Sequence, residues 1–145
     1  LYVDEGRMEP LPLAVIASLT ESRHEVQIFD DRMESIAFDT QADLVGITVE
    51  TFTARRSYEI AAEFRKRGVP VILGGIHVNL LQDEAMEHAD SIFLGDAEFL
   101  WEEVLNDLEQ DNLKPVYKSA IGIQPCGVYP SRSYYKKKGY LPVAL

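Results

Sequence analysis

The residues best suited to hold a ligand follow short apolar runs of the chain. Three such groups stand out: Thr48, Glu50, Thr51 and Phe52; Gly74, Gly75 and His77; and Gly95, Asp96, Ala97 and Glu98. Glycine lets a backbone approach a ligand closely or adopt a positive φ angle. The Gly74-Gly75 pair alone would equally suit a tight turn from strand to helix. Its combination with Gly95 and the threonines favours a ligand site.

The apolar runs that precede these groups are rich in β-branched residues and alternate with segments of helical period. This alternation predicts an α/β fold in which right-handed crossovers join parallel strands. The expected strands are residues 1–3, 25–29, 43–49, 71–73 and 91–94, with a short edge strand near 116–117. The expected helices are residues 11–21, 54–67, 80–88 and 99–109.

Five strands of this size fit a flavodoxin-like (Rossmann-like) sheet of order 2-1-3-4-5, between two helical layers in a three-layer sandwich. Ligands of such sheets bind at the carboxyl ends of the strands, near the point where the strand order reverses. All three candidate groups should therefore lie at one edge of the sheet. Replacing both Gly74 and Gly75 with Val is expected to abolish ligand binding and to leave the domain folded.

Composition and charge limit the classes of molecule that the chain is expected to contact and the compartment in which it is expected to work. The chain has 145 residues, a net charge of −10 and 46% apolar residues, enough for one core. The acidic body argues against a nucleic-acid surface, and the basic stretch at residues 136–138 is expected to be a solvated linker. No apolar run approaches the roughly 20 residues of a membrane span. The single cysteine, Cys126, leaves no internal disulfide and favours the reducing cytoplasm.

The familiar phosphate-binding motifs are missing from the expected strand ends. No Gly-x-Gly-x-x-Gly follows the first strand, there is no P-loop, and a phospho-accepting receiver would need Asp and Lys where Thr48 and Gly95-Asp96 stand. A wide, largely neutral edge remains, which suits a large, flat ligand decorated with amides. An FMN site built on Thr48, Thr51 and Thr53 is an alternative, although flavin proteins usually place that loop after strand 1. Here residues 5–9 are too acidic for it.

An ordered series of short stretches resembles one family over roughly residues 10–118: the cobalamin-binding domain found N-terminal to radical SAM enzymes. The stretches are residues 10–14, 24–26, 42–48, 58–61, 67–78, 88–90 and 95–98, with Trp101. The resemblance implies a corrin ring across the carboxyl edge of the sheet, in contact with the eleven candidate residues named above. It implies cofactor placement, with no catalytic residue and no metal ligand in this chain.

Two departures from related patterns shape this expectation. The signature Asp-x-His-x-x-Gly, whose histidine ligates cobalt, is absent, so cobalamin is expected base-off without a protein imidazole. A hydrogen-bonding or packing role is accordingly expected for His77. The three cysteines that hold the family's 4Fe-4S cluster are also absent, so the cluster and S-adenosylmethionine would belong to a missing domain.

The expected organisation is a cobalamin-binding domain at residues 1–118 and an arm at 119–145 that leads to a C-terminal radical SAM domain of the same polypeptide. The fragment alone would not be an enzyme, whereas the parent protein would be a methyltransferase. Rearrangement or cyclisation chemistry is left open by the resemblance. A degenerate module that docks or regulates without binding a corrin is the main alternative.

Overall fold

The computed structural model describes residues 9–20, 22–119, 127, 129–136, 138 and 140. The chain forms two compact units. One unit combines Leu1–Ile36 with Cys126–Leu145, and the other is Ala37–Pro125. The second unit contains the sheet and all three candidate groups, and is called the sheet unit below; the first is called the terminal unit.

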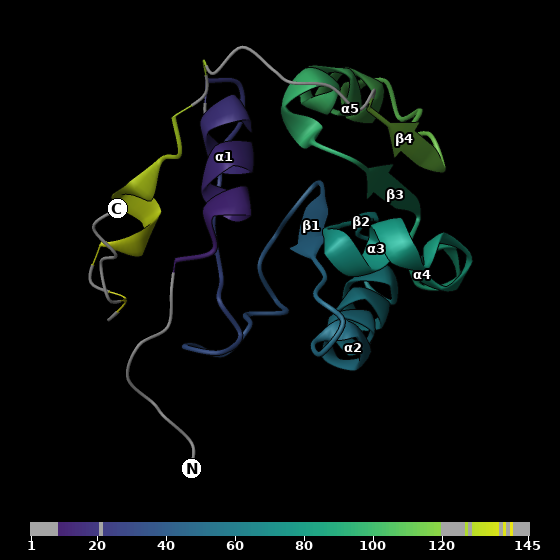
Figure 1. The fold of residues 1–145 in the computed structure, drawn as a ribbon, viewed down its shortest axis with the longest axis horizontal. Helices are drawn as coiled ribbons and strands as arrows, with labels where there is room; N and C mark the ends of the chain where they lie inside the picture. The colour runs from purple at the N-terminus through teal and green to yellow at the C-terminus, as the bar shows by residue number, and fades with distance from the viewer. Residues whose placement is uncertain are drawn as a thin grey trace. The chain divides into compact units, whose positions relative to one another are not determined.

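The sheet unit is built on four parallel strands (Figure 1). They are β1 (Val45–Thr48), β2 (Val71–Gly74), β3 (Ser91–Leu94) and β4 (Val116–Lys118), and they lie side by side in chain order. The side chains of β2 and β3 are almost wholly buried, with Leu73 0% and Ile92 1% exposed. Continuous apolar runs of this kind are typical of parallel strands covered on both faces.

Helices connect the strands and cover them. They are α2 (Ala54–Arg65), α3 (Ile76–Leu80), α4 (Gln82–His88), the 3-10 helix η1 (Ala97–Phe99) and α5 (Trp101–Glu109). Helix α2 packs against β1 and β2, and α3 and α4 pack against β3. The helix expected over residues 80–88 begins at Gln82 as α4, and a further short helix, α3, precedes it. The two are separate because the backbone at Leu81 is not helical (φ −130°, ψ 63°).

The α/β prediction with a parallel, flavodoxin-like sheet is confirmed, and so is the edge strand near residues 116–117. The expected strand count and order differ from those observed. Of the five strands expected in the order 2-1-3-4-5, the last three are β1, β2 and β3. The expected first strand, residues 1–3, lies outside the described residues.

The strand expected at residues 25–29 is not formed. Its alternation of polar and apolar residues is real, since Glu25 and Gln27 are exposed while Val26 and Ile28 are half-buried. A strand also needs a neighbouring backbone to complete its ladder. Here the Ile28 carbonyl instead accepts a hydrogen bond from Nζ of Lys138 (2.7 Å).

The terminal unit joins α1 (Leu11–Thr20) to the 3-10 helix η2 (Arg132–Tyr135). The Tyr135 hydroxyl donates to the Pro10 carbonyl (2.7 Å), and the Ser131 N–H donates to the Ala14 carbonyl (3.1 Å). The described residues of the expected arm that lie beyond Cys126 are therefore bonded to residues near the beginning of the chain.

A buried carboxylate stabilises this junction. Asp30 is 6% exposed and accepts hydrogen bonds from Nε of Arg32 (2.8 Å) and from the Tyr140 hydroxyl (2.7 Å). Burial by itself raises the pKa of Asp30, but the hydrogen bonds from Arg32 and Tyr140 outweigh it and lower the pKa to about 2. Asp30 therefore ties residue 140 to the N-terminal segment as an ionised group.

No helix within the described ranges has both the length and the apolar character needed to cross a membrane.

Candidate functional site

The carboxyl ends of β1, β2 and β3 meet at one edge of the sheet unit, as parallel pairing requires. Thr48, the last residue of β1, is paired in register with Gly74, the last residue of β2. Beyond this pair the Val49 N–H donates to the Gly74 carbonyl (2.8 Å), and the His77 N–H donates to the Val49 carbonyl (3.1 Å). These bonds join the loop after β1 to the start of α3.

Gly75 is required at this junction. Its φ angle of 101° lies in the region that residues with a side chain rarely adopt. A Cβ atom there would lie 2.8 Å from both the N and the O of Val49 and 3.0 Å from Oγ1 of Thr48. The Gly74→Val, Gly75→Val double substitution would therefore strain this junction, so a loss of binding in that variant would not by itself distinguish a lost site from a disturbed fold.

Gly95, which follows β3, lies close to Ser119 in the loop after β4. Its φ angle is 82°, and a Cβ atom there would overlap Oγ of Ser119, whereas the Ser119 backbone oxygen would lie 3.5 Å away. Ser119 follows β4 and is 5% exposed, and its N–H donates to the Leu94 carbonyl (3.0 Å). Ser119 was not among the predicted site residues, because the sequence does not show how closely the loops after β3 and β4 pack.

Asn79 is a second residue that the sequence reasoning missed. Its Nδ2–H donates to the Gly75 carbonyl (2.9 Å), and its Oδ1 accepts from the Gly95 N–H (2.9 Å). The four-residue spacing from Gly75 is the one at which a side chain on a helix can bond a backbone carbonyl of the preceding turn, and this was the available signal. Only the contact with Gly95 depends on tertiary structure.

His77 lies inside the unit and is 4% exposed. Its Nδ1 lies 3.4 Å from Oγ1 of Thr51, and its Nε2 lies 3.3 Å from Oε1 of Glu84. The hydrogen bonds from His77 and then Tyr58 lower the pKa of the Glu84 carboxyl. Both ring nitrogens of His77 thus have polar partners within the protein, which is the hydrogen-bonding role expected for it.

Exposed apolar side chains follow three neighbouring strands at this edge. Phe52 after β1 is 84% exposed, Ile76 after β2 is 53% exposed, and Phe99 after β3 is 44% exposed. All three side chains follow strand ends at the edge where ligands of such sheets bind.

The charged candidate residues at this edge lie on the surface of the sheet unit. Glu50, Asp96 and Glu98 are all exposed, and Ala97 is half-buried. Among the residues that the structure describes, no group of three or more His, Cys, Asp or Glu side chains is placed to hold a metal ion.

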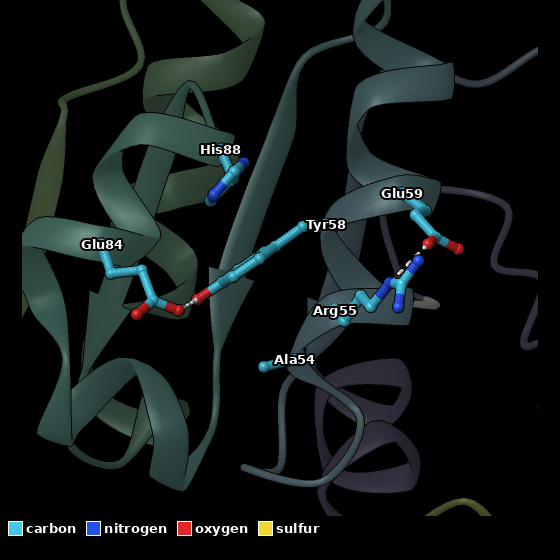
Figure 2. Close-up of a pocket in the computed structure, with 6 residues that line it drawn as sticks. All are labelled: Ala54, Arg55, Tyr58, Glu59, Glu84 and His88. Atoms are coloured by element: carbon cyan, nitrogen blue, oxygen red, sulfur yellow. Dashed lines mark hydrogen bonds and ion pairs between the residues drawn. The ribbon is translucent and has the colours of Figure 1, made fainter.

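A separate open groove of about 450 Å³ lies beside α2 and α4 (Figure 2). Its lining residues are Ala54, Arg55, Tyr58, Glu59, Glu84 and His88. The Tyr58 ring stacks on His88 with centroids 3.9 Å apart, and its hydroxyl donates to Glu84 (3.0 Å). Burial and then this bond raise the pKa of Tyr58 to about 12. None of the eleven predicted residues lines the groove, and its polar groups are engaged with one another.

The parallel sheet and its glycine-lined carboxyl edge define a flavodoxin-like α/β domain of the kind that binds a ligand at the strand ends. The chain belongs to the B12 binding domain family, whose model matches residues 3–105.

Named relatives agree with this membership. The chain is 42% identical over 120 residues to bacteriochlorophyllide d C-8(2)-methyltransferase of Chlorobaculum tepidum, and 34% identical over 123 residues to the C-12(1)-methyltransferase of the same organism. The matches cover 80% and 83% of this chain but only 27% of each relative, so the chain spans about a quarter of their length.

A solved structure shows the same fold. The N-terminal domain of the hypothetical protein TM0182 of Thermotoga maritima superimposes with a TM-score of 0.50 and 22% sequence identity. The superposition covers 82% of this chain and 98% of that domain.

Proposed function

We propose that this chain binds cobalamin across the carboxyl edge of β1, β2 and β3. The observation that carries the proposal is the row of exposed apolar side chains, Phe52, Ile76 and Phe99, after three neighbouring strands of a chain in the B12 binding domain family. A corrin ring is broad and flat, and its rim carries amide groups. It would cover apolar surface that is otherwise exposed to water.

The residues at the edge fit such a ligand. The corrin face would pack on the three apolar side chains, while the Thr48 and Thr51 hydroxyls offer donors and acceptors for its amides. Gly74 ends β2 at this edge, next to Thr48 in the sheet register. Bound cobalamin supplies a cobalt centre that can carry and transfer a methyl group, while this chain binds and orients the cofactor.

Burial of His77 supports base-off binding without an imidazole from this chain. An axial ligand would need a ring nitrogen free and directed at the ligand, whereas both nitrogens of His77 lie near Thr51 and Glu84. Freeing the ring would break these contacts and expose a buried side chain. His77 therefore acts as support for the loop after β1.

For the parent protein we propose a methyltransferase whose C-terminal radical SAM domain, with a 4Fe-4S cluster and S-adenosylmethionine, follows in the same polypeptide. The methyltransferase names of the relatives support this, as does the small share of their length that the chain matches. The single cysteine supports a cytoplasmic setting. No side chain of this chain is assigned as acid, base or nucleophile.

The test is a titration of the 145-residue chain with hydroxocobalamin, followed by desalting and a visible spectrum. A retained corrin spectrum with base-off bands is expected. Ile76→Asp should weaken retention at least tenfold, because it places a charge on the packing surface. The matched control is Val116→Asp at the first residue of β4, away from the carboxyl ends of the strands. The Val116 side chain is 42% exposed.

Each negative result points to a different conclusion. A folded wild-type chain that retains no corrin contradicts the proposal and favours a docking module without cofactor. Equal retention by Ile76→Asp and Val116→Asp would place the cofactor elsewhere on the chain. Retention of FMN in a parallel titration, with no retention of corrin, would favour the flavin alternative.

A further inference from the structure

The side chain of Asn79 connects two loops that start from different strands. Its amide nitrogen donates to the Gly75 carbonyl after β2, and its amide oxygen accepts from the Gly95 N–H after β3, both at 2.9 Å. Gly75 and Gly95 have φ angles of 101° and 82°. The contact therefore joins the two glycines with positive φ at this edge.

Only an amide side chain satisfies both partners. The Gly75 carbonyl already accepts the backbone N–H of Asn79 (3.3 Å), and the side-chain amide gives it a second donor. The same side chain supplies the acceptor for the Gly95 N–H. Aspartate would keep the acceptor but place a carboxylate oxygen against the Gly75 carbonyl. Alanine would leave the Gly95 N–H without its protein partner.

We propose that Asn79 is a positioning residue that fixes the loops after β2 and β3 relative to each other, and with them the shape of the cofactor edge. This inference rests on the proposed cobalamin site. Asn79 acts through the backbone at Gly75 and Gly95 and need not touch the cofactor. Ile76 and Phe99, two of the three apolar side chains, belong to the loops that it joins.

Two measurements on the 145-residue chain test this role. Hydrogen exchange at the Gly95 amide reports the contact directly and needs no cofactor. The dissociation constant for hydroxocobalamin, measured at a temperature where every variant is folded, reports the shape of the edge. The variants are Asn79→Ala and Asn79→Asp, and the control is Asn112→Ala, an exposed asparagine beyond α5.

Asn79→Ala is expected to speed exchange at Gly95 and to weaken corrin binding roughly tenfold, equivalent to about 1.4 kcal/mol. Asn79→Asp should protect Gly95 better than Ala does, because it keeps the acceptor, while its corrin affinity stays below that of the wild type. Asn112→Ala should leave both measurements unchanged. A role in stability alone would change the unfolding midpoint but not this order of affinities.

The outcomes separate the two proposals. A wild-type chain without corrin affinity overturns the cobalamin site, while Gly95 exchange still tests the link between the loops. Corrin binding that is equally tight in the wild type and in Asn79→Ala overturns the role of Asn79 and leaves the cobalamin site standing. Unchanged Gly95 exchange in Asn79→Ala also overturns the role of Asn79.

Discussion

Replacing Gly75 with Ala is expected to destabilise the sheet unit far more than alanine replacement at Gly68 or Gly74. The added Cβ atom would meet the N and O of Val49 at 2.8 Å, closer than carbon approaches these atoms without displacement. Neither atom can move freely, because the Val49 N–H donates to Gly74 and the Val49 carbonyl accepts from His77. Relief of the contact must therefore distort the junction of β1, β2 and α3.

The magnitude follows from three contributions. A residue other than glycine at φ 101° is strained by about 1–3 kcal/mol. Weakening the two backbone hydrogen bonds of Val49 costs about 1 kcal/mol each. The smaller conformational freedom of alanine in the unfolded chain returns about 0.4–1 kcal/mol. The net loss in the free energy of unfolding is about 3 kcal/mol.

Two other glycines provide matched controls. Gly68 has a φ of 76°, but a Cβ atom added there would meet no atom within 4 Å, so Gly68→Ala carries only the backbone strain, about 1 kcal/mol. Gly74→Ala has neither a positive φ nor a close contact and should change stability by less than about 0.5 kcal/mol.

The assay is urea unfolding followed by the fluorescence of Trp101, the one tryptophan, which is 7% exposed in α5 and so reports the sheet unit. A loss for Gly75→Ala no larger than that for Gly68→Ala would refute the reasoning. It would mean that the close approach to Val49 relaxes without energetic consequence.

The remaining predictions concern the terminal unit and the core. The pKa of Asp30 is lowered from its ordinary 3.8 to about 2. Ionised Asp30 therefore adds about 2 kcal/mol to the free energy of unfolding above pH 4, and this contribution is lost as the pH falls toward 2. Asp30→Asn should abolish this pH dependence of stability, which is followed on acidification through the NMR signals of α1. Asp31→Asn, at an exposed neighbour, should keep the pH dependence. Identical pH profiles for the two variants would contradict the assignment to Asp30. Leu73→Ala, at a fully buried site in β2, should cost about 3 kcal/mol in urea unfolding, against less than about 1 kcal/mol for exposed Val116→Ala. Similar losses for the two would show that β2 is not the centre of the core.

Local patterns predicted most of the sheet unit. The apolar runs at β1, β2 and β3 are recognisable as strands without knowledge of their neighbours. Only β2 and β3 are largely buried along their length, as continuous apolar strands covered on both faces are. The helix expected over residues 54–67 is formed as α2, and Gly68 just beyond it has the positive φ typical of a helix C-terminus. The candidate groups could be assigned to one edge because the carboxyl ends of parallel strands share that edge.

Other features depend on partners distant in the chain. Residues 25–29 have the alternation of a strand, but a ladder needs a second backbone, and the Ile28 carbonyl bonds to Lys138 instead. The described residues of the expected arm beyond Cys126 contact residues near the beginning of the chain, through bonds such as that from Tyr135 to Pro10. No local pattern encodes such contacts.

The sequence by itself determined the class of fold, the edge that carries the candidate site and the glycines that this edge requires. Each of these follows from short-range periodicity and from the conformations that a residue type permits. Only the tertiary structure decided that His77 is buried between Thr51 and Glu84, and that Asn79 links Gly75 to Gly95. Those contacts join loops from different strands, and their geometry exists only after the strands have paired.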